Sequence, residues 1–341
     1  YCLPSIMAPK NYETLRGRCR IVLFTDAGSY TKLLGFTEGM EDVGFDLDIC
    51  LIPNELMATL PRGTSDPDFA AKQLNKYWIL GVAQNTAIQM AKRAGMAIHI
   101  LHPDHIYGPE YFYNLFRLSD KYEAIAQTSI SANADGASTE LNRYIQPNGA
   151  LVVPDRDLGD IGWRHLHKQT RAAIMNTATI PDDMPESHLW LWVGKDKLHL
   201  YCCHMNMAYL SAKCVATAPT RIPATVDAEL PSFMPKDFYV PKAEDGMTFI
   251  EISDESKADN PRRVGIVDLA KHCWLKTRFS LDWQPYVERV CEVPIVSRQK
   301  PGDYMEEAHI KAQHAELVGL LLELRGPDTI ATEFISGLAF Q

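Results

Sequence analysis

Several features that mark common protein classes are missing from this chain of 341 residues. It has no apolar run of about 18 residues, so we expect no transmembrane helix, and no secretory signal is recognisable. None of its eight cysteines forms a C-x-x-C pair, which argues against a cysteine zinc site and favours reduced thiols. The sequence therefore predicts a soluble, cytoplasmic protein and leaves peripheral membrane association open.

The motifs of several large enzyme families are also missing. The chain contains no G-x-x-x-x-G-K-[ST], no G-x-G-x-x-G, no H-E-x-x-H and no G-x-S-x-G. Their absence argues against P-loop, classical dinucleotide-binding, zincin and α/β-hydrolase proteins. Lys and Arg form no block and the net charge is −9, so we expect no nucleic-acid partner. A few local cations or a helix N-terminus can still bind an anionic ligand.

What the chain does contain is typical of a globular protein, with 46% hydrophobic and 23% charged residues. Short apolar runs alternate with helical patterns in its first half, and Gly95 is a good helix stop. This order predicts an α/β fold class with an open, mostly parallel, Rossmann-like sheet. The expected elements are strands at 20–25, 46–52 and 96–101, with helices at 33–43 and 67–94.

The second half has a different character. Residues 151–260 are rich in Trp, His and turn residues, which indicates a mixed α+β lobe. We expect an α/β half over 1–150, the mixed lobe over 151–260, and a C-terminal helical extension over 261–341 packed on the same unit. Further expected elements are helices at 109–120 and 305–325 and a strand at 124–131.

Polar residues follow the predicted strands. Ligands bind outside the carboxyl ends of strands in parallel sheets, so Thr25 and Asp26 are candidate cofactor-binding residues. The segment Leu101-His102-Pro103-Asp104-His105 follows another strand and offers oxygen and nitrogen atoms that can bind a divalent cation or a ribose. The alternative for this segment is a turn in which Asp104 caps the next helix.

Three later clusters also carry candidate site residues. If residues 164–171 are helical, Arg164, His167, Lys168 and Arg171 share one face that suits an anionic phosphate or acidic sugar. His204 ends a predicted strand and is a candidate metal ligand. Two carboxylates, Asp227 and Glu229, could act as catalytic base and orienter. The alternatives are a solvated basic helix face, a hydrogen-bonded core histidine and ordinary surface acids.

The order of these features resembles GT-A-type glycosyltransferases, in particular glycosyltransferase-like proteins of bacterial surface-polysaccharide biosynthesis. The similarity rests on the opening segment 3–11, on the helix and strand that lead to His102-Pro103-Asp104, and on loose motifs at 166–167, 185–190, 204–206, 225–227 and 251–253. It covers residues 1–255.

The resemblance implies a nucleotide-sugar donor and a saccharide or glycolipid acceptor. In the family, Mn²⁺ or Mg²⁺ on a D-x-D motif neutralises the leaving diphosphate. Here His102 replaces the first Asp while Asp104 keeps the second place, and His204 resembles a late histidine that completes the metal shell. The resemblance makes Asp227 a catalytic carboxylate near the acceptor.

Two other functions stay open. The altered D-x-D motif fits a catalytically inactive protein of the same fold that binds or assembles with partners. A metal-dependent hydrolase is the third reading, with candidate ligands among His102, Asp104, His165, His167 and His204. Two or three histidines converging on one ion with an open coordination site would favour the hydrolase. Dispersed histidines at strand ends beside a nucleotide-sized cleft would favour the transferase.

Overall fold

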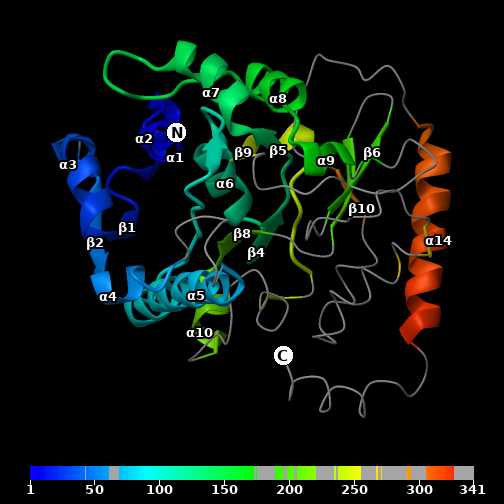
Figure 1. Ribbon diagram of the computed structural model, residues 1–341, viewed down its shortest axis with the longest axis horizontal. Coiled ribbons are helices and arrows are strands. Elements are labelled where there is room, and N and C mark those ends of the chain that lie inside the picture. Colours follow the sequence, from blue (N-terminus) through cyan, green and yellow to red (C-terminus); the bar gives the residue numbers. More distant parts are fainter. Residues whose placement is uncertain are drawn as a thin grey trace. The chain divides into compact units, whose positions relative to one another are not determined.

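The structure is a computed structural model. The chain divides into two compact units, which we describe separately. Unit 1 comprises Tyr1–Leu166, Met205–Lys257 and Pro294–Arg298, and unit 2 comprises His167–His204, Ala258–Val293 and Gln299–Gln341. The helices and strands of the chain give a mixed α/β fold class (Figure 1). The structure describes residues 1–42, 44–60, 69–172, 174, 189–194, 198–202, 206–219, 234–235, 237–254, 266–267, 270, 290–292 and 305–325.

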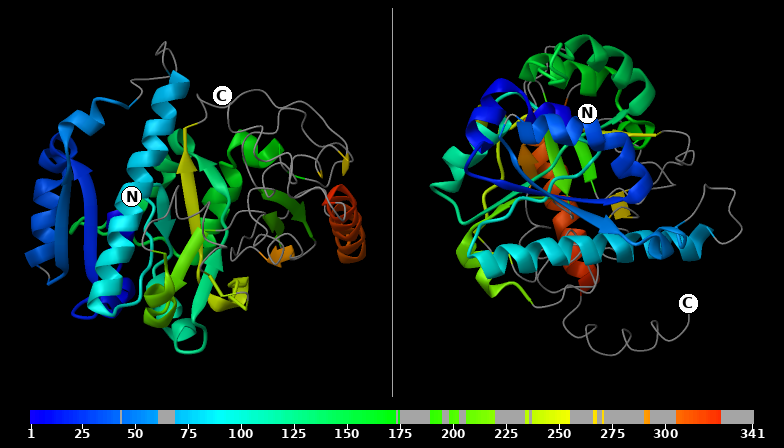
Figure 2. Two further views of the ribbon diagram at one scale, coloured as in Figure 1. Left: turned by 90° about the horizontal axis from the view of Figure 1, so that it is seen from below. Right: turned by 90° about the vertical axis from the view of Figure 1, so that its left-hand side faces the viewer.

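After two short helices, unit 1 contains a strand–helix–strand motif that the sequence predicts. Strands β1 (Arg20–Asp26) and β2 (Asp46–Ile52) pair in parallel from Arg20 opposite Asp46 to Asp26 opposite Ile52, and α3 (Ala27–Asp42) connects them. Apolar and β-branched side chains favour both strands. The helix begins earlier than the predicted residue 33, because Asp26 caps it. Figure 2 shows α3 along one side of the strand pair and α5 along the other.

The predicted third strand at 96–101 is wrong. Helix α5 (Phe69–Ala94) ends as expected at Gly95, whose φ is 64°. In the segment that follows, only Ile98 forms a bridge, antiparallel to Leu210. Among the described residues β1 and β2 therefore form a two-stranded sheet, and an open Rossmann-like sheet is not formed. A short helix, α4 (Asn54–Met57), follows β2.

Two small sheets form the centre of unit 1. In the first, β9 (Phe249–Ser253) pairs antiparallel with β3 (His105–Tyr107) and parallel with β5 (Ser131–Asn133). In the second, β4 (Ala124–Gln127) pairs antiparallel with β8 (Asn206–Leu210). The single strand predicted at 124–131 is thus two strands in different sheets, since residues 128–130 belong to neither.

The core of unit 1 packs against helix α6 (Tyr111–Ser119), which the sequence predicts at 109–120. Tyr111, Phe112, Leu115 and Leu118 lie on its buried face, at the spacing of an amphipathic helix. Burial of each such side chain contributes roughly 1.5–3 kcal/mol to the free energy of unfolding. They share a cluster with Ile6, Met40, Tyr107, Ile125, Met247 and Phe249.

One buried asparagine joins three elements of this unit. Asn11, in α2 (Pro9–Leu15), donates from Nδ2 to the carbonyl oxygens of Ser5, in α1 (Cys2–Ile6), and Gly108, at 3.1 and 2.8 Å. Its Oδ1 accepts from the backbone N–H of Phe112 at 3.0 Å. These bonds fix the start of α6 against the N-terminal helices. The remaining elements of unit 1 are α7 (Ala134–Leu141), η1 (Asn142–Tyr144), α8 (Asp155–Arg164), α10 (Ala212–Thr217) and η3 (Ala243–Asp245).

Unit 2 contains a three-stranded antiparallel sheet in the order β10 (Val290–Glu292), β7 (Leu198–Cys202), β6 (Leu189–Val193). It also contains α9 (Lys168–Ala172) and α14 (Glu307–Arg325), and the latter confirms the helix predicted at 305–325. None of the described helices in either unit is long and apolar enough to cross a membrane, as the sequence predicts. The described cysteines outside the sheet of unit 2 are free thiols, as expected: Cys2, Cys19, Cys50 and Cys214.

Candidate metal centre

Three potential metal ligands come together in the turn that leads into β3. The backbone N–H of His105 donates to the His102 carbonyl at 3.1 Å, which closes the turn. The Asp104 carbonyl accepts from the N–H of Ile252 at 2.9 Å, so the turn is attached to β9. The sequence predicts His102 and Asp104 as metal ligands, and the structure adds His105 beside them.

The geometry of this group suits one cation. Each of the three side chains offers one ligand atom, and these atoms lie within 4.8 Å of one another. The rings of His102 and His105 have centroids 4.6 Å apart. Ligands bound tetrahedrally at about 2.1 Å would lie about 3.4 Å apart, so small side-chain rotations would complete the site.

The environment of each ligand also fits a metal. His105 is 2% exposed, and burial, followed by the neighbouring His102 and His99, holds its pKa well below the usual value. Its ring is therefore neutral and keeps the lone pair that coordination needs. Asp104 is exposed and His102 is half-buried, so the ion would remain accessible from solvent on that side.

The shell around His105 is aromatic. Its ring centroid lies 5.0 Å from that of Phe249, and its Nδ1 lies 3.5 Å from the hydroxyl oxygen of Tyr107. His105 is also directly opposite Glu251 in the pairing of β3 with β9. Directly opposed residues of antiparallel strands have their side chains on the same face, so a carboxylate lies on the His105 side of this sheet.

Thr25 and Asp26, the residues predicted to bind the nucleotide, lie at the carboxyl end of β1, as expected. The Asp26 side chain, however, is hydrogen-bonded to the start of α3. Its Oδ1 accepts from the backbone N–H groups of Gly28 and Ser29 at 2.9 and 3.0 Å, so it caps α3. Hydrogen bonds from Ser29 are the main reason that the pKa of Asp26 is lowered. Thr25 is 8% exposed.

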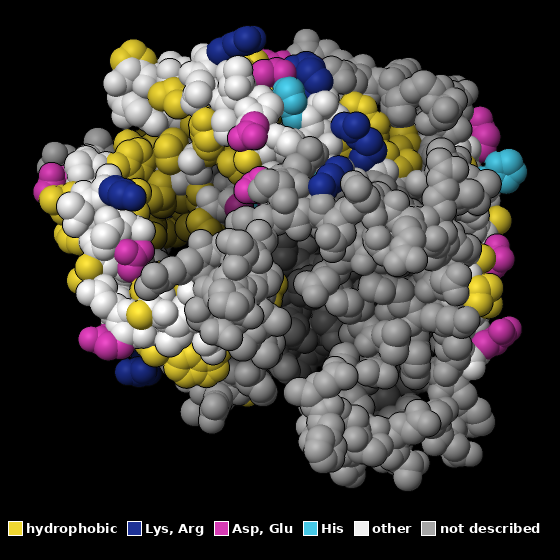
Figure 3. Space-filling model, viewed as in Figure 1, with side chains coloured by type: hydrophobic (Ala, Val, Ile, Leu, Met, Phe, Trp, Pro, Cys, Tyr) yellow, Lys and Arg dark blue, Asp and Glu magenta, His cyan; other side chains and the backbone are white. Residues whose placement is uncertain are grey.

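The basic face predicted over 164–171 does not form as one helical face. Helix α8 ends at Arg164 and α9 begins at Lys168, because residues 165–167 leave the helix. Arg164 pairs with Glu140, and His165 Nε2 lies 2.6 Å from the other oxygen of the same carboxylate. Lys168 and Arg171 lie on α9, where basic side chains reach the surface (Figure 3), and His167 is 2% exposed.

The remaining predicted site residues, His204, Asp227 and Glu229, lie outside the described residues. Their roles as metal ligand and catalytic carboxylates stay predictions. Comparisons with protein-family models, with curated proteins and with solved structures found no match for this chain.

His105 and Glu251 differ in how far the sequence indicates that they belong to this site. His105 belongs to the predicted polar segment, and the spacing of three from His102 is the signal that a turn could bring both rings together. Glu251 gives no such signal, because only the pairing of β3 with β9 places it opposite His105.

Proposed function

We propose that this chain is a divalent-metal-dependent enzyme that holds its ion on His102, Asp104 and His105. The convergence of two imidazoles and one carboxylate in a single turn carries this proposal. Three protein ligands leave a coordination position for water or substrate, as in catalytic rather than structural zinc sites. A bound divalent ion supplies Lewis acidity and lowers the pKa of a coordinated water.

Hydrolysis is the reaction class that this arrangement supports best. A tight group of His and Asp side chains is what distinguishes a metal-dependent hydrolase from a transferase with dispersed histidines. Zn²⁺ suits the ligand set, and the same two-histidine, one-carboxylate set also suits Fe²⁺. The face that Asp104 and His102 leave accessible is where a substrate would approach the ion.

Glycosyl transfer from a nucleotide sugar is the second candidate. It is supported by the parallel β1–α3–β2 unit, which has Thr25 and Asp26 at the carboxyl end of its first strand. In this candidate, a Mn²⁺ or Mg²⁺ ion at His102 and Asp104 would neutralise the diphosphate of the donor, and the acceptor would be a saccharide or glycolipid. A cytoplasmic location is part of the same proposal.

Metal titration tests the claim that both candidate functions share, namely that His102 and Asp104 bind a divalent ion. The full chain, stripped of metal, is titrated with Zn²⁺, Mn²⁺, Mg²⁺ and Fe²⁺ by calorimetry, alongside Asp104→Asn and His102→Gln. Each variant should lose at least about tenfold in affinity, equivalent to about 1.4 kcal/mol. His309→Gln, at an exposed histidine of α14, is the matched control and should bind as the unmodified protein does.

Activity then separates the two reactions. Metal-dependent turnover of simple esters or phosphoesters, lost in Asp104→Asn, would support hydrolysis. A melting shift with one UDP-, GDP-, CMP- or ADP-sugar in the presence of Mn²⁺ would support transfer, since saturation at 100 Kd stabilises by about 2.7 kcal/mol. Equal metal affinity in Asp104→Asn and the unmodified protein would overturn the metal centre and leave a non-catalytic binding protein.

A further inference from the structure

A buried tyrosine lies beside the candidate metal centre. Tyr107 follows His105 by two residues on β3, so both side chains are on the same face of that strand. Tyr107 is 1% exposed, and its backbone N–H donates to Oγ of Ser5 at 3.2 Å, which attaches this part of β3 to α1. Its ring packs on three aromatic neighbours, at centroid distances of 4.6, 5.2 and 6.1 Å from Tyr111, Phe112 and Phe249. The strand and these rings hold the side chain in place.

The hydroxyl group of Tyr107 is directed at one of the candidate ligands. It lies 3.5 Å from Nδ1 of His105, at the long end of hydrogen-bond distances. A buried tyrosine hydroxyl normally finds a hydrogen-bond partner, and His105 supplies one here. Among the described residues, none hydrogen-bonds to the other ring nitrogen, Nε2. The ring of His105 therefore has one nitrogen beside the tyrosine and one left for an ion.

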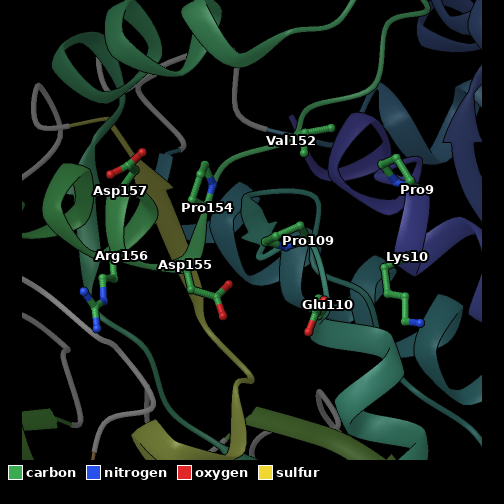
Figure 4. A pocket seen from close by; sticks show the side chains of 9 residues that line it. All are labelled: Pro9, Lys10, Pro109, Glu110, Val152, Pro154, Asp155, Arg156 and Asp157. Carbon is green, nitrogen blue, oxygen red and sulfur yellow. The ribbon is translucent and has the colours of Figure 1, made fainter.

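The cavity near the end of β3 does not include this pair of side chains. Gly108 follows the strand, and the carboxylate of Asp155 packs against it at a cavity of about 630 Å³ (Figure 4). Neither His105 nor Tyr107 belongs to the lining, which comprises Pro9, Lys10, Pro109, Glu110, Val152, Pro154, Asp155, Arg156 and Asp157. A molecule in this cavity would therefore not compete with His105 for the Tyr107 hydroxyl.

A histidine that binds a metal through one ring nitrogen almost always donates the N–H of the other to a neighbouring group, which fixes the tautomer and the orientation of the ring. We propose that Tyr107 is this neighbour: its hydroxyl oxygen accepts the Nδ1–H of His105, which leaves the lone pair of Nε2 for the ion. The inference rests on the metal-dependent function proposed above. It makes Tyr107 a positioning residue, because it contacts a ligand of the ion and not the ion itself.

The tautomer of His105 in the metal-free protein tests the hydrogen bond without any ion. Long-range proton–nitrogen NMR correlation spectra of the full chain near neutral pH show which ring nitrogen of each histidine carries the proton. The variant His105→Gln identifies the signals of His105. We expect the proton on Nδ1 in the unmodified protein, and the loss of this preference in Tyr107→Phe. A proton on Nε2 in the unmodified protein would show that the hydroxyl donates to Nδ1, and would overturn the proposal.

Titration with Zn²⁺ measures the consequence for metal binding. Tyr107→Phe keeps the shape of the ring and removes only the hydroxyl group, so the variant should fold. By calorimetry near neutral pH, it should bind Zn²⁺ about 10- to 100-fold more weakly than the unmodified protein. An unmodified protein that binds no Zn²⁺ would overturn the metal centre and this inference with it. Equal Zn²⁺ affinities in the two proteins would overturn the role of Tyr107 alone.

Tyr111→Phe is the matched control for the loss of a buried hydroxyl group. Tyr111 packs on Tyr107 and is 0% exposed, but its hydroxyl donates to Oε1 of Gln127 and not to a candidate ligand. We expect Tyr111→Phe to leave both the tautomer of His105 and the Zn²⁺ affinity as they are in the unmodified protein. An equal loss of Zn²⁺ affinity in Tyr111→Phe and Tyr107→Phe would show a general effect of a weakened core, and would overturn the role assigned to Tyr107.

Discussion

Replacing Asp155 with asparagine should stabilise the folded protein at neutral pH and leave its stability in acid nearly unchanged. The pKa of this carboxyl is about 6 in the folded state, against 3.8 for an unperturbed aspartate. The folded state therefore holds the proton more tightly than the unfolded state does. Below about pH 4 the carboxyl is protonated in both states and does not affect the free energy of unfolding. As the pH rises to about 6, ionisation lowers this free energy increasingly. Asparagine never ionises, so it avoids the cost.

The magnitude follows from the same two values. Their difference corresponds to about 3 kcal/mol at about 1.4 kcal/mol per pKa unit. Asp155 is only partly buried, so solvent screening reduces the expected gain to about 1–2 kcal/mol. Burial is the main cause of the raised pKa, and the negative charge of Glu110 adds to it.

Urea unfolding at about pH 4 and about pH 7.5 measures the effect. Asp155→Asn should raise the free energy of unfolding at the higher pH only, with an unchanged m-value. Asp157→Asn, in the same turn, is the control for a general loss of negative charge at the start of α8. A gain of equal size at both pH values, or no gain at about pH 7.5, would refute the assigned burial of Asp155.

Three further substitutions, each followed by urea unfolding, test local contacts in unit 1. Gly108→Ala should destabilise by about 1–3 kcal/mol because the new methyl overlaps Asp155, and the double variant with Asp155→Ala should recover most of the loss; a neutral Gly108→Ala would contradict the contact. Asn133→Ala should cost about 0.5–2 kcal/mol, since Oδ1 caps α7 by accepting from two backbone N–H groups. Arg164→Ala should cost less than about 1 kcal/mol, because Arg164 is exposed and solvent screens its pair with the half-buried Glu140, and a larger loss would show a different role.

The sequence predicts elements that depend on local patterns. The runs at 20–25 and 46–52 are apolar and β-branched, and the segment between them is helical, so β1, α3 and β2 follow from short-range preferences. Gly95 is correctly predicted as a helix stop, since its positive φ is a backbone requirement that glycine meets at little cost.

Strand partners depend on tertiary structure and are less predictable. Residues 96–101 have the apolar composition of a third parallel strand, yet only Ile98 bridges, to a residue more than a hundred positions later in the chain. Nothing in the local pattern indicates that β9 rather than a neighbour in sequence will pair with both β3 and β5. The alternation of side chains along a strand determines which residues share a face of the sheet, but it does not determine which strand will pair with it.

The metal centre and the surroundings of Asp155 differ for the same reason. The metal centre is largely predictable because His102, Asp104 and His105 are nearly contiguous, so one turn is enough to bring them together. The contact of Asp155 with Gly108 is not, because Asp155 follows Pro154 at the start of a helix, where acidic residues are ordinary. The burial that raises the pKa of Asp155 arises only because Gly108, directly after β3, leaves room for the Asp155 carboxylate. A methyl group at position 108 would overlap this carboxylate, so Gly108→Ala tests the contact and Asp155→Asn tests the cost of the buried charge.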